Sequence, residues 1–498
     1  MFREVNDIVI VGGGTSAWFS AAFLARNLDV NVTLVDKEVG SPVGVGEGTL
    51  LFFDKFLKRC GFKTDEWFNE VGATHKSGIL FPNWGKKDNL VWHPFLLNKE
   101  YPEYDSSMYE AWTHYQDEGF QELGAFFNIS VENRVDTQNL QSYAQHVDAS
   151  KLVVWIQKQL EGKITIIKSE MININRSNDG FITSIDLKNG RNISGDLFVD
   201  CTGFRQLLQQ NPDRVDLKGR LFCDTAVAGR VPYKDINRER HPYVVSEAVD
   251  HGWVWNIPVQ ERIGSGLVFN RSVTDPEEAK RYFCEYWDNR ISPEDCKLID
   301  WTPYYNKNMW EGNVVAIGLS AGFIEPLEST GLAGITTSIY ELAARIRQKW
   351  YNQADVNMFN AIMMAVYEDA IDFINMHYAY TDFDTPFWNY VKENHVMCEA
   401  HKWYKGLIER GEKLPNDGKG FFFGGANWLC WLMQIEKTIG ANKHIDKETA
   451  KKILDDWKDV VKIGYEKPAT ISHDEAIENF ALYLNLSMDE RELEWRKI

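Results

Sequence analysis

The sequence predicts a mixed α/β fold that begins with a parallel βαβ unit, continues through an antiparallel meander and ends in a mostly helical part. Three regions carry this prediction. In residues 7–38 two apolar runs flank a glycine-rich turn and a helical pattern. Residues 163–204 alternate apolar and polar side chains between the turns SNDG and KNGR, which is typical of antiparallel strands. Beyond residue 350 the chain becomes helical and rich in aromatic residues.

The composition limits the classes of function. The chain has 498 residues, a length that allows roughly two to four domains. Its net charge of −18 argues against nucleic acid or an anionic membrane as the main partner. The seven cysteines lie far apart without a CxxC pattern, so neither a disulfide framework nor a metal site is expected. No apolar run approaches the roughly 18 residues of a membrane span, and we expect a cytoplasmic protein.

The first element pair indicates a dinucleotide site. A strand over Ile8 to Val11 meets Gly12, Gly13 and Gly14, and a helical pattern then leads to a second strand that ends at Asp36. Gly12 permits the tight turn, Gly14 lets the backbone approach a pyrophosphate, and Ala17 takes the third small position of the GxGxxG pattern. Asp36 lies near the distance at which an acidic residue binds a ribose hydroxyl. This motif alone does not separate NAD from FAD.

The downstream order of elements favours FAD. The meander closes on an apolar strand, Leu197 to Val199, and on the turn DCTGF. A late strand, GNVVAIG, ends at Gly318 and leads to PLESTG. This order resembles flavoproteins of the glutathione-reductase and aromatic-hydroxylase type, which have a Rossmann-like module with an antiparallel meander.

The stretch PLESTG marks the start of a helix. The run behind it has apolar residues at Leu332, Ile335, Ile339 and Leu342, a spacing typical of an amphipathic helix. Free backbone N–H groups and the positive end of the macrodipole gather at such a start and favour anions. On these features alone, a proline-led helix cap is the simpler interpretation.

Four further stretches together indicate a family. They are GVGEGT (Gly44 to Thr49), THKSG around Lys76, GWVWNIP (Gly252 to Pro258) and FIEPLESTG (Phe323 to Gly331). The combination resembles the flavin-dependent halogenases of the tryptophan-halogenase type over most of the first 335 residues. Each stretch alone is weak, because two tryptophans at period two usually form one buried face of a strand.

The resemblance implies a reaction. It implies FADH2- and O2-dependent halogenation of an electron-rich aromatic, in which chloride or bromide attacks a flavin C4a-hydroperoxide to give hypohalous acid. A separate flavin reductase would supply FADH2. Trp253, Trp255 and Ile257 would keep the organic substrate away from the flavin and so suppress hydroxylation.

The resemblance also assigns the reacting groups. Thr330 and Gly331 would bind the halide beside the flavin. Glu328 would be catalytic, either by stabilising the cationic ring and accepting its proton or by polarising hypohalous acid. Lys76 would be the second catalytic residue, either by hydrogen bonding to hypohalous acid or by carrying the halogen as a haloamine. The sequence leaves these alternatives open.

The substrate is expected to be an electron-rich aromatic, indole- or phenol-like. Free tryptophan is disfavoured, and a substrate without an amino-acid end is at least as compatible with the sequence. His93 and Phe95 match family positions that sandwich the aromatic ring. We find no match for the glutamate that holds free tryptophan in the family. An aromatic group in the C-terminal part either forms an apolar pocket or packs between helices: Phe421, Phe422, Phe423, Trp428 and Trp431.

We expect residues 1–345 to form the FAD-binding module, with an insertion at about residues 85–140 that joins the substrate domain, and residues 346–498 to form a helical substrate-pocket domain. The expected cofactor-binding residues are Gly12, Gly14, Thr15, Ser16, Ala17, Asp36, Gly46, Glu47, Gly48, Thr49, Gly318 and Gly331. A homo-oligomer is compatible with the sequence. The alternative functions are an aromatic hydroxylase of the same fold and a flavin-binding protein that does not halogenate.

Overall fold

A six-stranded sheet holds the glycine-rich front of the chain. The computed structural model describes residues 2–37, 46–95, 106–117, 125–210, 212–413, 421–466 and 469–487. The strand order is β10-β3-β2-β14-β23-β22, and all neighbours are parallel except β22 and β23. The strands are β2 (Asp7–Val11), β3 (Asn31–Asp36), β10 (Thr165–Lys168), β14 (Leu197–Asp200), β22 (Trp310–Glu311) and β23 (Val314–Ala316). The predicted βαβ start is confirmed.

The predicted meander is also confirmed. Three antiparallel strands follow one another along the chain: β11 (Met171–Arg176), β12 (Ile182–Leu187) and β13 (Asn192–Ser194). Their apolar residues Ile182, Ile185 and Leu187 pack on the outer face of the first sheet, in a small core of their own. The alternation of apolar and polar residues therefore had a physical cause, since one face is buried and the other faces water.

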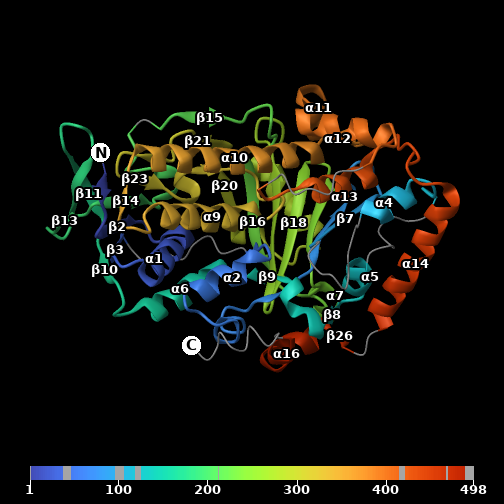
Figure 1. Cartoon of the computed structure of the whole chain (residues 1–498), viewed down its shortest axis with the longest axis horizontal. Helices are drawn as coiled ribbons and strands as arrows, with labels where there is room; N and C mark the ends of the chain where they lie inside the picture. Colours follow the sequence, from blue (N-terminus) through green and yellow to red (C-terminus); the bar gives the residue numbers. More distant parts are fainter. Residues whose placement is uncertain are drawn as a thin grey trace.

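A second sheet of seven strands forms the centre of the molecule (Figure 1). Its order is β20-β16-β19-β18-β17-β6-β7. The strands are β6 (Gly78–Pro82), β7 (Leu90–Pro94), β16 (Thr225–Val231), β17 (Val244–Val249), β18 (Gly252–Val259), β19 (Arg262–Phe269) and β20 (Lys297–Asp300). A small sheet beside it joins β4 (Glu47–Gly48), β9 (Ala144–Val147) and β5 (Thr74–Lys76).

Two long helices run side by side along the molecule (Figure 1). They are α9 (Thr330–Arg345) and α10 (Gln353–His377), and α9 also packs on α1 (Thr15–Asn27). The helix predicted after PLESTG is therefore confirmed, and it begins at Thr330. The other helices are α2 (Phe52–Arg59), α3 (Thr64–Trp67), α4 (Ser106–Trp112), α5 (Ala125–Val131), α6 (Ala149–Leu160), α7 (Ile236–Glu239), α8 (Pro276–Tyr286), α11 (Pro386–Asn394), α12 (Glu399–Glu409), α13 (Gly425–Ile435), α14 (Lys447–Glu466), α15 (His473–Glu478) and α16 (Phe480–Ser487).

The segment predicted as an insertion contacts the C-terminal part. β7 packs on α13, while α4 and α5 pack on α14. The main hydrophobic core contains residues from both sides of residue 345. The division into two domains stays a prediction. Within the described ranges, every helix is too short or too polar to span a lipid bilayer.

The chain returns late to the strand that carries Lys76. The short strand β26 (Thr470–Ser472) pairs with β8 (Arg134–Asp136). The next residue, His473, accepts a hydrogen bond from the backbone N–H of His75 through Nε2 at 3.2 Å. This hydrogen bond therefore connects the segment near residue 473 to β5, the strand that carries Lys76. The remaining short strands are β1 (Arg3–Glu4), β15 (Arg214–Asp216), β21 (Tyr304–Asn306), β24 (Gly322–Phe323) and β25 (Trp350–Tyr351).

Candidate active site

Lys76 lies buried beside the PLESTG segment. Strand β5 carries it, and its side chain has no exposed surface. Its Nζ donates to the Thr49 carbonyl oxygen at 3.0 Å and to Ser329 Oγ at 2.9 Å. A Cβ at Gly48 would lie 2.7 Å from that Oγ and 3.2 Å from Nζ, so glycine is needed for this approach. Burial lowers the pKa of Lys76 to about 7, because desolvation disfavours the ammonium form.

Glu328 lies between two histidines. Its carboxylate contacts His93 Nδ1 at 3.0 Å through both oxygens and His377 Nε2 at 2.7 Å through Oε1. Burial alone would raise the pKa of Glu328, but His93 and His377 lower it to about 2. His93 Nε2 in turn contacts Asn427 Nδ2 at 3.0 Å. Glu328 is therefore a buried carboxylate held by partners from two other elements, β7 and α10.

The start of α9 offers a free donor and open space. Ser329 has a left-handed backbone conformation, with φ 60°. Thr330 is buried, and no group in the described part of the chain forms a hydrogen bond with its Oγ1. A Cβ at Gly331 would meet nothing within 4 Å. An orphan hydroxyl next to open space at a helix start is suited to a small anion. The halide-binding role of Thr330 and Gly331 stays a prediction.

The front sheet forms a cavity suited to a dinucleotide. Its volume is about 480 Å³, and its lining includes Gly12, Gly13, Gly14, Asp36 and Thr202. At Gly12, φ is 135° and a Cβ would lie 2.2 Å from the Cys201 carbonyl oxygen. At Gly14 a Cβ would meet nothing within 4 Å. The backbone is thus open where a pyrophosphate would approach, so the residues present fit FAD.

The other predicted cofactor residues are in two places. Thr15, Ser16 and Ala17 form the first turn of α1 behind the glycines, and Gly318 lies over Ser16. Gly46 to Thr49 lie at β4, where burial and then Asp148 raise the pKa of Glu47 to about 7. Gly44 and Val45 of this motif lie outside the described residues.

Two alanine substitutions in the glycine turn should have different effects. Gly12→Ala should lower the free energy of unfolding by about 2 to 3 kcal/mol, because its Cβ meets backbone at a positive φ. Gly14→Ala should leave stability unchanged and weaken FAD binding about tenfold, or about 1.4 kcal/mol, because its Cβ takes space needed by the pyrophosphate. Denaturant unfolding and quenching of flavin fluorescence measure the two effects. Equal flavin affinity of Gly14→Ala and wild type would contradict the proposed site.

The three residues of the WxWxIP stretch share one face of β18. Trp253, Trp255 and Ile257 are all buried. Ile257 lies against Gly46, since a Cβ there would be 3.5 Å from its Cγ2. Trp253 Nε1 donates to Glu325 Oε2 at 3.2 Å. These three side chains, called the wall below, thus contact the segment of Gly46 through Ile257 and the segment FIEPLESTG through Trp253.

Aromatic rings from several elements lie beside Lys76 and beside the two histidines that hold Glu328. The Phe95 ring lies 5.2 Å from Lys76 Nζ. Phe373 of α10 stacks on Phe423 at 4.1 Å and contacts Trp428 at 5.4 Å. Trp431 instead packs on His377, with ring centroids 3.8 Å apart. The substrate-binding role of these residues stays a prediction.

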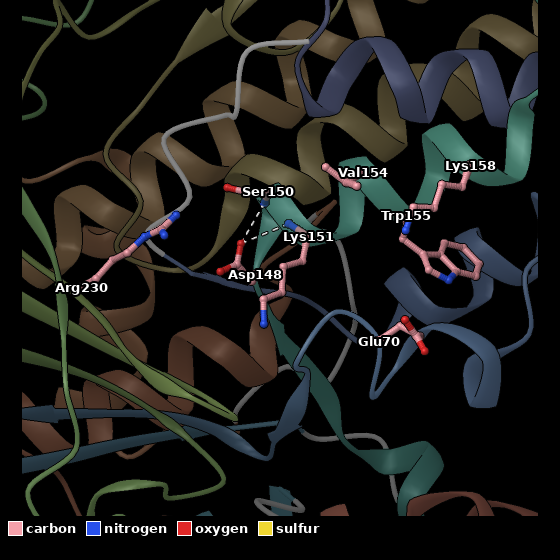
Figure 2. A pocket seen from close by; sticks show the side chains of 8 residues that line it. All are labelled: Glu70, Asp148, Ser150, Lys151, Val154, Trp155, Lys158 and Arg230. Atoms are coloured by element: carbon pink, nitrogen blue, oxygen red, sulfur yellow. Dashed lines mark hydrogen bonds between the residues drawn. The ribbon is translucent and has the colours of Figure 1, made fainter.

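A separate hollow of about 320 Å³ lies at the start of α6 and contains none of the residues predicted for the site (Figure 2). Asp148 caps α6 there by accepting from the backbone N–H groups of Ser150 and Lys151. The lining carries both signs of charge: Glu70, Asp148, Ser150, Lys151, Val154, Trp155, Lys158 and Arg230. Among the residues that the structure describes, no three His, Cys, Asp or Glu side chains gather in a way that could hold a metal ion.

Sequence reasoning missed three groups that the structure places at the site. His377 contacts Glu328, Asn427 contacts His93, and Glu325 holds Trp253. Glu325 is part of the quoted stretch FIEPLESTG, so its position near the wall could have been anticipated. His377 ends a long helix, and no local pattern distinguishes it from a structural histidine.

Comparison with known proteins identifies the family of the chain. The family model described as tryptophan halogenase matches residues 7–445. Tryptophan 6-halogenase ThaL of Streptomyces albogriseolus is 32% identical over 85% of this chain and 86% of its own length. Tryptophan 7-halogenase RebH of Lentzea aerocolonigenes is 31% identical over 87% of this chain and 90% of its own.

Solved structures agree as well. Tryptophan 6-halogenase SttH of Streptomyces toxytricini superposes with a TM-score of 0.84, at 26% identity over 97% of this chain and 100% of its own. A flavin-dependent halogenase of Xanthomonas campestris shares the fold, with a TM-score of 0.85 at 24% identity over 96% of this chain and 99% of its own. The chain therefore belongs to the tryptophan halogenase family and is a flavin-dependent halogenase, an oxidoreductase.

Proposed function

We propose that the protein halogenates an electron-rich aromatic, indole- or phenol-like, that has no amino-acid end, and that Lys76 and Glu328 direct the halogen. One observation is the main support for this proposal: Lys76 and Glu328 are both connected to the segment PLESTG. Glu328 belongs to PLESTG, and Lys76 is hydrogen bonded to the next residue, Ser329. The orphan hydroxyl of Thr330 follows directly. A halide-binding helix start thus adjoins a buried amine and a buried carboxylate.

The glycine-lined cavity and the start of α9 would hold FAD, delivered as FADH2 by a separate flavin reductase. Reduced FAD with O2 supplies the oxidising power that converts halide to hypohalous acid. Thr330 and Gly331 would bind the halide through the hydroxyl and the free N–H groups of the helix start. Trp253, Trp255 and Ile257 would keep the organic ring on the other side of the wall, which favours halogenation over hydroxylation.

Lys76 would receive the oxidised halogen, and Glu328 would act on the ring. The Lys76 side chain is fixed by two acceptors, so an N–H can be directed at hypohalous acid without a further loss of side-chain entropy. The Glu328 carboxylate would stabilise the positive charge that develops as the halogen adds. Both groups are shielded from water, which strengthens each interaction.

The contacts of two carboxylates support the proposal that the substrate has no amino-acid end. Glu436 accepts from Tyr380, His401 and Lys405. Asp369 accepts from the backbone N–H groups of Phe422 and Phe423. Glu436 and Asp369 are thus already engaged by groups of the protein. A substrate ammonium would have to displace these partners, whereas a neutral indole would need only apolar contacts.

Mass spectrometry of reaction products tests the proposal. The protein is supplied with FAD, a flavin reductase, NADH, and either chloride or bromide, together with indole, a phenol or free tryptophan. We expect a halogen isotope pattern in the indole or phenol product and at least about tenfold less turnover of tryptophan, which corresponds to about 1.4 kcal/mol. Faster turnover of tryptophan would contradict the substrate class. Only hydroxylated product or hydrogen peroxide with every substrate would contradict the proposed reaction.

A further inference from the structure

His377 contacts Glu328 from the end of a long helix. It is the last residue of α10, and its ring is fully buried. Nδ1 lies 2.8 Å from the Phe373 carbonyl oxygen, and Nε2 lies 2.7 Å from Glu328 Oε1. A carbonyl oxygen accepts and never donates. Nδ1 must therefore carry a hydrogen.

The second ring nitrogen needs a hydrogen as well. A neutral imidazole has a single N–H, so with Nδ1 protonated a neutral His377 would turn the Nε2 lone pair toward Glu328 Oε1. A contact of 2.7 Å between a lone pair and a carboxylate oxygen would be repulsive. His93 does not supply this hydrogen, because its Nδ1 faces both oxygens of Glu328 from the other side. The geometry requires a hydrogen between Nε2 and Oε1. The contacts with His93 and His377 lower the pKa of Glu328 to about 2, so this hydrogen belongs to His377 as an imidazolium and Glu328 is a carboxylate.

Three surroundings favour the imidazolium. The carboxylate is its direct partner. The negative end of the α10 macrodipole lies at His377 and favours a cation there. Aromatic rings surround the cation, with centroids of Trp431 at 3.8 Å and Phe81 at 5.3 Å from the imidazole. Burial lowers the pKa of His377 below its ordinary value, and the contacts with Glu328 and the Phe373 carbonyl oppose this shift without reversing it. The assignment of the imidazolium therefore rests on the hydrogen-bond geometry.

We propose that His377 is a positioning residue that donates to Glu328 from an imidazolium ring and so keeps the carboxylate charged and fixed. This inference rests on the proposed function for its catalytic meaning. It deepens that function, because a carboxylate held by two ring N–H groups is a weak proton acceptor. Glu328 then acts as a fixed negative charge beside the ring, and the proton released by the arene goes to solvent or to another base.

Other titratable groups lie near His377 and Glu328, and they decide which residues the test must leave unchanged. Among the described residues, His93 approaches from β7 and Lys76 acts on Glu328 from β5. Helix α13 and strand β6 contribute uncharged rings, Trp431 and Phe81. His93 and Lys76 therefore remain unchanged in every variant used.

Nitrogen-15 NMR of the histidine side chains tests the protonation state directly. The full protein is labelled at histidine, and the His377 signal is identified by its loss in His377→Gln. We expect both ring nitrogens of His377 to be protonated at neutral pH in the wild type and the ring to become neutral in Glu328→Gln. If one ring nitrogen of His377 is unprotonated in the wild type, the inference is wrong. This readout needs no turnover, so failure of the proposed function would leave it interpretable.

The pH profile tests the positioning role. Without the imidazolium, burial raises the pKa of Glu328, so in His377→Gln the acid limb of kcat should move to higher pH and kcat should fall by up to about a hundredfold. His401→Gln is the matched control, because it removes a buried contact of 3.2 Å to Glu436. It should lower Tm without moving the limb. An acid limb that stays in place in a folded His377→Gln variant would overturn the positioning role.

Discussion

Lys76→Ala is expected to abolish halogenated product almost completely, by roughly a thousandfold, while FAD binding and oxygen consumption persist. The reason is the position of the Lys76 amine relative to the proposed halide site and the cofactor cavity. The Nζ of Lys76 is fixed by the Thr49 carbonyl and Ser329 Oγ beside the proposed halide site, and the cofactor cavity at the glycine turn does not include it. Hypohalous acid would still form in the variant, but no amine would hold it near the ring.

The measurement combines product mass spectrometry with an assay of free hypohalous acid. In the variant, scavengers in solution should capture the halogen that the wild type transfers to the substrate. Lys234→Ala is the control, because that lysine is exposed and pairs with Asp288 at the surface, and it should retain wild-type turnover. If Lys76→Ala halogenated its substrate at the wild-type rate, Lys76 would have no role in directing the halogen.

Glu328→Gln is expected to lower kcat about a hundred- to a thousandfold with little change in KM. The substitution keeps the size of the side chain and removes its negative charge. If the charge stabilises the cationic ring, the loss falls on the transition state and not on substrate binding. Steady-state kinetics with the substrate found by the mass-spectrometric screen measures both constants.

The matched control for this variant is Glu436→Gln. Glu436 is also buried and also contacts a histidine, His401, but it lies among residues of α12 and α13. This control should lose stability and keep its kcat. An equal loss of kcat in the two variants would mean that Glu328 acts only through the stability of the fold.

The front of the molecule could be predicted from sequence because its signals are local. The strand at Ile8 to Val11, the glycines and Asp36 lie within one βαβ unit, and each residue type has a steric or electrostatic reason to be there. The start of α9 was predicted for the same reason. Only the family resemblance predicted that Lys76 and PLESTG lie close together, because 253 residues separate Lys76 from Ser329.

The contacts around Glu328 could not be predicted in this way. His377 is 49 residues away from Glu328, and its role depends on where α10 ends relative to the preceding loop. Periodicity places an aromatic residue on a helix face but does not decide its neighbour. Trp428 and Trp431 illustrate this, because they lie on the same helix and have different neighbours. Trp428 contacts Phe373, whereas Trp431 packs on His377.

The hydrogen bond from His75 to His473 has a consequence for the order of synthesis and folding. The strand that carries Lys76 is made early, yet its neighbour His75 is held by a residue that the ribosome adds 398 positions later. At about 5–20 residues per second, the first sheet can form well before this support exists. Loop closure over such a distance is slow. The nascent chain should therefore acquire its cofactor cavity before the strand that carries Lys76 gains its support from His473.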